Sequence, residues 1–154
     1  HKITSLNKQR QQEQGFEIKK KIIKSSMILK QTWVHAADNT NVGWLQIFHL
    51  YKGFHRRSTT VGFFVKGSTR VVEPPRIEYK GFKFKFNKQG DVCRMLLVRV
   101  ARILPRADGS SIKLFTNSGI LIKKKQNVKS KFIHGPSLYQ LKRKKFNSLY
   151  KTIL

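Results

Sequence analysis

The stretch "VCRMLLVRVARI" (residues 92–103) is the most continuous apolar segment of the chain. A run of Val, Leu and Ile of this kind is typical of a strand that is buried on both faces. Shortly before it, "FKFKF" (residues 82–86) alternates Phe and Lys with the period of two that a strand requires, and the turn residues Gln89-Gly90-Asp91 separate the two segments. This part of the sequence therefore predicts two strands joined by a tight turn.

Further short strands with turn signals between them extend on both sides of this segment. Strands are expected in "MILKQTWVHAADNT" (27–40), "VGWLQIFHLYKG" (42–53) and "VGFFVKG" (61–67). A hairpin is expected in "PRADGSSIKLFTNSGILIKKK" (105–125), with an Asp-Gly turn, a strand from Ser111 to Phe115, a turn at Asn117–Gly119 and a strand from Ile120. Closely spaced short strands with glycine turns predict a mainly β fold, in the form of a small barrel.

The two ends of the chain depart from the strand pattern. Residues 1–26 are rich in Lys and Gln, and we interpret them as a basic arm that is partly helical or is ordered by a partner. A transit peptide is the weaker interpretation of the arm. After Pro136, apolar residues from Leu138 to Leu149 recur at helical spacing and predict a short C-terminal helix. The expected domains are thus an N-terminal extension (1–26) and a β-barrel domain with this helix (27–154).

Net charge is the strongest compositional signal. The chain carries 33 Lys and Arg residues against 7 Asp and Glu residues, a formal charge of +26 at pH 7 with a sequence pI near 10.8. Self-repulsion of this size destabilises a compact domain that stands alone, so we expect a partner with dense negative charge. Nucleic acid is the first expectation and an anionic membrane surface is the second. No apolar segment approaches the length of a membrane span.

Residue types that serve catalysis or bind metals are scattered along the chain. Asp38, Asp91 and Asp108 each lie in a turn, where a short carboxylate bonds nearby backbone N–H groups, and no two acids are paired as a general acid and base. The one cysteine, Cys93, excludes an internal disulfide and is expected to be a small core residue. The histidines lack zinc-ligand spacing, and neither a P-loop nor a nucleophilic serine motif occurs. We therefore expect no enzyme activity, no cofactor and no metal.

The segment "GFHRRSTTVG" (residues 53–62) places three basic side chains side by side after a strand, namely His55, Arg56 and Arg57. Arginine guanidinium groups bind phosphate oxygens bidentately, and the Ser and Thr hydroxyls that follow add hydrogen-bond donors. A glycine at each end lets the backbone approach a bulky partner closely. We interpret this segment as a phosphate-contacting loop, and the alternative is a solvated charged loop.

Basic residues recur in three more segments, which makes a phosphate-covered surface more plausible than isolated solvated faces. "VRVARILPRADGS" (98–110) marks a strand end and its turn, "LIKKKQNVKSK" (121–131) is a loop without acids, and "KRKK" (142–145) lies on the expected helix. In "FKFKF", either the Phe rings stack on bases or they pack on protein while the Lys residues face phosphate. The residues predicted to contact RNA are His55, Arg56, Arg57, Lys52, Lys83, Lys85, Arg99, Arg102, Arg106, Lys123, Lys124, Lys125, Lys129, Lys131, Lys142, Arg143 and Lys144.

Several of these motifs, taken in this order, resemble the family of the universal large-subunit ribosomal protein fourteen. The resemblance extends from Met27 to about Tyr150. It implies a five-stranded β-barrel with a protruding β-ribbon and C-terminal helical turns, and RNA contact by the His-Arg-Arg loop. The matching residues are Gln31-Thr32, Ala37-Asp38-Asn39, His55-Arg56-Arg57, Gly90-Asp91-Val92, Val98-Arg99, Asp108-Gly109-Ser110 and Gly135-Pro136.

The same resemblance implies the partners of the protein. A member of this family binds large-subunit ribosomal RNA and lies at the subunit interface, where it touches small-subunit RNA. It also contacts the neighbouring large-subunit protein nineteen, and in bacteria and organelles it docks a ribosome-silencing factor. The predicted function is a structural constituent of the large ribosomal subunit. The alternative is a free-standing barrel that binds single-stranded RNA or DNA, and a cationic membrane-surface protein is a third, weaker hypothesis.

Departures from the family pattern indicate a divergent organellar member. We expect it in the mitochondrial matrix, on the ribosome, and the alternative is another organelle or the cytoplasm. Extra residues lie between Lys66 and Lys88, and the composition is rich in Lys, Phe and Ile. Where the family has a glycine, this chain has Asn41, and Asn is the best substitute for glycine in a left-handed turn. We therefore expect this turn to be kept.

Overall fold

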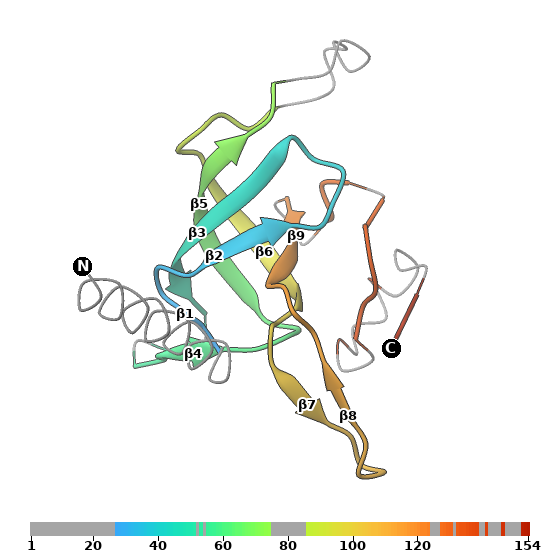
Figure 1. Cartoon of the computed structure of the whole chain (residues 1–154). Coiled ribbons are helices and arrows are strands. Elements are labelled where there is room, and N and C mark those ends of the chain that lie inside the picture. The colour runs from blue at the N-terminus through green and yellow to red at the C-terminus, as the bar shows by residue number, and fades with distance from the viewer. Residues whose placement is uncertain are drawn as a thin grey trace, which may run out of the picture.

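The structure of the chain, a computed structural model, describes residues 27–51, 53, 55–74, 86–123, 127–130, 132–138, 141, 146 and 152–154. Strands dominate these ranges, which confirms the mainly β class (Figure 1). The strands are β1 (Ile28–Leu29), β2 (Trp33–Ala36), β3 (Val42–Leu50), β4 (Ser58–Thr59), β5 (Phe64–Val72), β6 (Val92–Arg99), β7 (Ile103–Pro105), β8 (Ser111–Lys113) and β9 (Ser118–Ile122).

Five of these strands close into a barrel in the order β2-β3-β5-β6-β9. Neighbouring strands are antiparallel except for β9 and β2, which pair in parallel through His35 with Ser118 and Ala36 with Gly119. This last pairing removes the free edges that an open sheet would have. β7 and β8 form a separate antiparallel ribbon that projects from the barrel (Figure 1). The five-stranded barrel and the protruding ribbon expected from the resemblance are both present.

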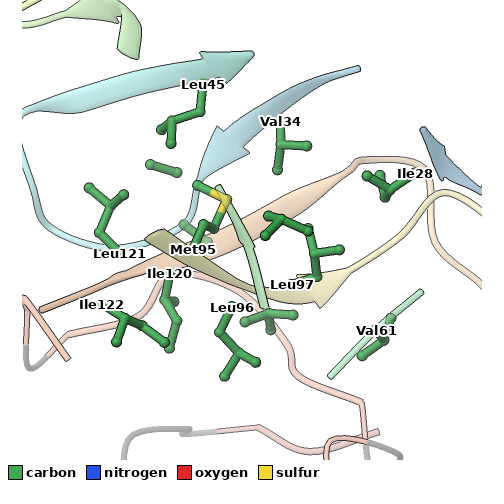
Figure 2. Close-up of a cluster of buried hydrophobic side chains, with 14 of the residues drawn as sticks. Ile28, Val34, Leu45, Val61, Met95, Leu96, Leu97, Ile120, Leu121 and Ile122 are labelled. Carbon is green, nitrogen blue, oxygen red and sulfur yellow. The ribbon is translucent and has the colours of Figure 1, made fainter. Parts of the chain in front are cut away.

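The barrel interior is filled by one face of each strand. Leu50, Val65, Met95 and Leu121 pair in register across β3, β5, β6 and β9, and each is at most 2% exposed. Figure 2 shows Met95 at the centre of this buried cluster. Gly119 makes room for it, because a Cβ there would lie only 2.5 Å from the Met95 Sδ atom.

The outer face of β6 and β9 is covered as well. Leu96 and Ile120 pair in the row next to Met95 and Leu121, so they face the opposite side of the sheet, yet both are buried (Figure 2). Apolar residues that follow β9 belong to the same core cluster and cover this side; they are Ile133, Leu138, Leu141 and Phe146. β6 is therefore buried on both faces, as its continuous apolar sequence predicts.

Two predicted boundaries are wrong. The turn expected at Asn117–Gly119 is not a hairpin turn, because β9 begins at Ser118 and pairs with β6 and β2, whereas β8 pairs with β7. The strand expected at 61–67 instead runs from Phe64 to Val72. Gly67 does not end it; a Cβ there would lie 2.8 Å from the Gln46 carbonyl oxygen, so glycine allows β3 and β5 to pair closely.

The left-handed turn expected at Asn41 is also wrong. Among the described residues, Gln31 is the one non-glycine with a positive φ, at 71°. The Asn41 side chain instead accepts a hydrogen bond from the Asn87 N–H at 3.2 Å and donates one to the Asn87 carbonyl oxygen at 2.9 Å. An amide in this position ties the start of β3 to the segment that precedes β6.

Several predictions fall largely outside the described residues. The arm (1–26), most of "FKFKF" (82–85) and most of the segment expected to be helical (139–140, 142–145 and 147–151) belong to this group. The C-terminal helix is thus not shown. Of the described residues near it, Ser137 forms a parallel bridge with Ile153, and the Leu141 N–H donates to the Leu138 carbonyl oxygen at 3.0 Å.

Candidate nucleic-acid interface

The basic loop that precedes β5 is held in a defined shape. Its framing glycines, Gly53 and Gly62, have φ values of 107° and 84°, a conformation that side chains rarely adopt. Arg56 is half-buried; its Nε–H donates to the Ser58 carbonyl oxygen at 2.9 Å, and its guanidinium lies 4.4 Å from the centre of the Phe63 ring. A guanidinium has five N–H donors, so this single bond orients the group and leaves donors for a phosphate.

The other residues of the loop differ in their setting. His55 and Arg57 are exposed next to Arg56. Lys52 lies outside the described residues. The short pairing of β4 with β1 anchors the strand that follows the arginines, so the basic side chains extend from a fixed backbone.

Arg99 has a structural role that the sequence does not suggest. Its Nη1 donates to the carbonyl oxygens of His134 at 2.8 Å and Pro136 at 2.9 Å. Gly135 leaves room for this contact, because a Cβ there would lie 2.6 Å from Nη1. Burial lowers the pKa of the guanidinium, which nonetheless stays protonated. Arg99 therefore fastens the C-terminal segment to the barrel, and its RNA contact stays a prediction.

The ribbon carries two further predicted residues. Arg102 is half-buried near its base, and Arg106 is exposed near its tip. Asp108 shapes the tip by accepting hydrogen bonds from the Ser110 hydroxyl at 2.6 Å and the Ser110 N–H at 2.9 Å, and these bonds lower the pKa of its carboxyl. The predicted role of this acid in a turn is confirmed. Asp91 acts in the same way, because it accepts the Lys88 N–H at 2.8 Å.

Asp38 acts over a longer range than a turn residue. Its carboxylate accepts hydrogen bonds from the Thr40 hydroxyl at 2.6 Å and from the Leu121 N–H, in the distant strand β9, at 2.7 Å. The Ala37 N–H donates to the Gly119 carbonyl oxygen just before it. The carboxylate thus extends the parallel pairing that closes the barrel. Burial outweighs its hydrogen bonds and raises the pKa of this carboxyl.

The basic loop after β9 contains one exposed lysine and one half-buried lysine among its described residues. Lys123 is exposed, whereas Lys129 is half-buried and donates a hydrogen bond to the side-chain oxygen of Asn87. Burial lowers the pKa of the Lys129 ammonium. Cys93 also contacts that oxygen, packs partly buried against the core, and has a thiol pKa raised by burial. The remaining predicted residues lie outside the described ranges; they are Lys83, Lys85, Lys124, Lys125, Lys131, Lys142, Arg143 and Lys144.

The predicted RNA-contacting residues that the structure describes gather at two ends of the barrel. The loop of residues 53–62 is called the arginine loop below. Its Gly62 N–H donates to the Leu97 carbonyl oxygen, so the arginine loop ends beside the last residues of β6. Arg99 and the ribbon follow at that same end. β6 and β9 are antiparallel, with Arg94 opposite Ile122 and Arg99 opposite Ser118, so Lys123 lies at the other end. The structure therefore groups the arginines and separates them from the lysine loop.

The part of the chain that forms this closed barrel and its ribbon matches a known protein family. The sequence profile of the family described as Ribosomal protein L14p/L23e matches residues 27–152. The chain belongs to this family. Ribosomal L14p/L23e proteins are structural, non-enzymatic constituents of the large ribosomal subunit, and membership implies a location on the ribosome.

The described part of this L14p/L23e chain offers neither a cluster of metal ligands nor a membrane-spanning helix. No three His, Cys, Asp or Glu side chains within the described ranges could share a metal ion. No helix among those residues has the length and hydropathy needed to cross a membrane.

The structure also reveals surface residues that the sequence reasoning did not single out. Trp33 and Trp44 point outward from β2 and β3, and His49, Lys66 and Arg94 meet across three strands. The alternation in "WVHA" (33–36) could have placed Trp33 on an outer face. The cross-strand set could not have been found, because those residues become neighbours through strand pairing alone.

Proposed function

We propose that this L14p/L23e chain binds ribosomal RNA through its basic loops and lies near the interface of the ribosomal subunits. The observation that carries the proposal is the loop with Arg56 and Arg57, which the closed barrel presents at the same end as the ribbon. A net charge of +26 without a comparable set of acids supports a polyanionic partner.

Its mechanism is charge neutralisation and positioning. Lys and Arg side chains contact phosphates, and the barrel keeps their spacing fixed, so the protein stabilises one arrangement of folded RNA. Specificity arises from the shape of the RNA and from few base contacts. No reaction is part of this function.

The double substitution Arg56→Glu and Arg57→Glu tests the proposal. It replaces two phosphate-binding groups by carboxylates, which phosphates repel, so we expect the variant to be nearly absent from sedimented large subunits. The measurement is the amount of tagged protein that tracks the subunit through a salt wash.

A matched control keeps the same net charge. The single variants Arg57→Glu and Lys88→Glu carry the same net charge, and Lys88 is an exposed lysine just before β6, at the opposite end of that strand from the arginine loop, so Lys88→Glu should still be incorporated. Normal incorporation of the double arginine variant would contradict the proposal. If the arginine and lysine variants were lost from the subunit to the same degree, the loss would be an effect of total charge and would not support a specific arginine contact.

The finer partners and the compartment are also proposals. Resemblance to the family supports contacts with protein nineteen, with small-subunit RNA and with a ribosome-silencing factor. The basic arm and the Lys-, Phe- and Ile-rich composition support a mitochondrial ribosome. Crosslinking within purified ribosomes should recover protein nineteen, and a tagged full-length protein should co-fractionate with mitochondrial large subunits.

One observation favours a second candidate, a free-standing barrel that binds single strands. Such a protein needs exposed aromatic side chains on the barrel face, and Trp33 and Trp44 meet this requirement. Sedimentation separates the two functions. A ribosomal constituent remains with the large subunit after a salt wash, whereas a free-standing protein sediments as a monomer.

A further inference from the structure

The outer face of β2, β3 and β5 differs from that of β6 and β9 because large side chains remain exposed there. Trp33 is 47% exposed, Trp44 40% and Val71 47%. The strand pairing places His35 opposite Trp44 and Trp44 opposite Val71, so they form one row across three strands. Trp33 lies opposite Gln46, diagonally next to Trp44 at about 7–8 Å. The two tryptophans thus form one aromatic surface.

Polar contacts hold this aromatic surface in place. The His35 ring meets the Trp44 ring edge to face, with centroids 5.2 Å apart and planes at 82°. Gln46 donates to the Gln31 side-chain oxygen at 2.7 Å and accepts from the Arg70 Nε at 2.8 Å. These bonds order the groups around the tryptophans, so the surface needs little rearrangement to receive a ligand.

A basic row crosses the same face further along β3. Lys66 pairs in register with His49 on one side and with Arg94 on the other. Tyr51 lies among them: the Arg94 Nε donates to its hydroxyl at 3.1 Å, the His49 ring meets its ring at 5.2 Å, and the Lys66 Nζ is 6.0 Å from the ring centre. Like charges directly opposite each other destabilise a sheet, so an anion at this row would relieve the repulsion between Lys66 and Arg94.

The sequences of the five barrel strands contain neither Asp nor Glu. Nothing in the strands themselves therefore neutralises the basic row. From Trp44 to His49 the distance along β3 is roughly 16 Å at the usual rise of a strand. A ligand that satisfies both parts must present flat apolar faces and negative charges within that span.

We propose that this outer face binds an unpaired segment of RNA, whose bases stack on Trp33 and Trp44 while its phosphates lie at the His49–Lys66–Arg94 row. The proposal deepens and rests on the proposed function of RNA binding, but it uses a different surface from the arginine loop and the ribbon. Unpaired nucleotides fit because each offers both a base face and a phosphate. The bases of a duplex are stacked inside the helix and cannot reach the tryptophans.

The chain provides its own reporter for this site, because Trp33 and Trp44 are its only two tryptophans. Titration of the full chain with a short single-stranded RNA that forms no hairpin should quench the tryptophan fluorescence. A duplex RNA with the same number of phosphates should bind, as measured by the anisotropy of a labelled strand, with little quenching. This measurement needs no substitution and so does not depend on how variants fold.

Substitutions then identify the stacking residue. Trp44→Ala should weaken binding of the single strand about 5- to 150-fold, the range measured for loss of one base–aromatic stack. Trp44→Phe keeps an aromatic ring and should largely restore the affinity. Phe115→Leu is the matched control, because Phe115 is an exposed aromatic residue on the chain that follows the ribbon strand β8.

The basic row is tested separately by the dependence of RNA affinity on salt concentration. Each phosphate contact with a single strand contributes roughly −0.7 to the slope of log affinity against log salt concentration. Lys66→Gln should therefore flatten the slope of the quenching titration by about 0.7. Lys88→Gln removes an exposed lysine from the turn before β6, outside both proposed RNA surfaces, and should leave this slope unchanged.

The outcomes distinguish this inference from the proposed function. RNA binding without quenching, unaffected by Trp44→Ala, would overturn the inference and leave the proposed function standing. Failure of both the single strand and the duplex to bind would overturn both. If Trp44→Ala preserved RNA affinity but prevented crosslinks to neighbouring ribosomal proteins, the face would be a protein-docking surface and the inference would be wrong.

Discussion

At the scale of single residues, Asp38 carries two opposing contributions to stability. Its carboxylate accepts hydrogen bonds from the half-buried Thr40 hydroxyl and from the Leu121 N–H, which would otherwise be buried without an acceptor. Burial of the charge works against this and raises the pKa of the carboxyl. The oxygen atoms of this side chain therefore matter more than its charge. Asp38→Ala should lower the free energy of unfolding by about 1–3 kcal/mol, measured by urea denaturation, and Asp38→Asn by less.

The same residue predicts a pH dependence. Because the folded-state pKa of Asp38 lies above its ordinary value of 3.8, the folded chain binds this proton more tightly than the unfolded chain does. The contribution to stability is fully present below the ordinary pKa and is lost as pH rises through the folded-state pKa. Relative to Asp38→Asn, the unsubstituted chain should gain stability as pH falls from neutrality toward 3.8. A difference that stays constant over this range would contradict the assignment.

The hydrogen bonds of Arg99 lead to a prediction about how the C-terminal segment is attached to the barrel. Arg99→Leu removes two hydrogen bonds to the carbonyl oxygens of His134 and Pro136, and we expect the free energy of unfolding to fall by about 1–2 kcal/mol. Tryptic cleavage after Lys129 should become faster, because Leu138 and its neighbours would cover the barrel less often. Arg106→Leu, at the exposed ribbon tip, is the control. Equal cleavage rates in the two variants would refute this role of Arg99.

At the scale of elements, two glycines on barrel strands predict different responses to an added methyl group. A Cβ at Gly119 would lie 2.5 Å from Met95 and 2.7 Å from the Leu96 carbonyl oxygen, whereas one at Gly43 would find its nearest neighbour at 3.5 Å. Gly119→Ala should therefore cost about 1–3 kcal/mol of stability by overpacking, and Gly43→Ala should be close to neutral. Thermal unfolding of both variants checks this, and similar melting temperatures would contradict it.

The elements differ in how far the sequence could predict them. The buried strand β6 and the Asp-Gly turn of the ribbon follow from local signals, namely a continuous apolar run and a turn dipeptide. The start of β9 could not be predicted from local signals, because Ser118 and Gly119 are residue types that usually indicate a turn. Glycine is needed there to accommodate Met95, which comes from another strand. Packing between distant segments therefore decides this boundary.

The candidate interface was also predictable only where its residues form a local sequence motif. The arginines of the loop form a local motif, and the structure describes them on a fixed backbone. Arg99 and Lys129 are basic in sequence but have partners within the chain, which only the fold brings close. The basic row at Lys66 is assembled from three strands and has no local signal at all.

At the scale of the whole molecule, the barrel should fold without the basic arm. All five barrel strands lie between Trp33 and Ile122, and the family profile begins at residue 27. Removal of residues 1–24 should leave the circular dichroism spectrum of the barrel and its cooperative unfolding intact, while a peripheral contact of the particle is lost. Unfolding on truncation would refute this. The control is the full chain, measured in the same salt because its net charge of +26 is sensitive to screening.

The parallel pairing of β9 with β2 has a consequence for the nascent protein. β2, β3, β5 and β6 are all synthesised before Ser118, and until then they form at most an open sheet in which β2 and β6 lack one neighbour each. The last strand can fill that gap only after residues 118–122 have been synthesised. A polypeptide arrested ahead of Ser118 would keep two unpaired borders available to other chains, so premature termination there should yield aggregates rather than a smaller soluble protein.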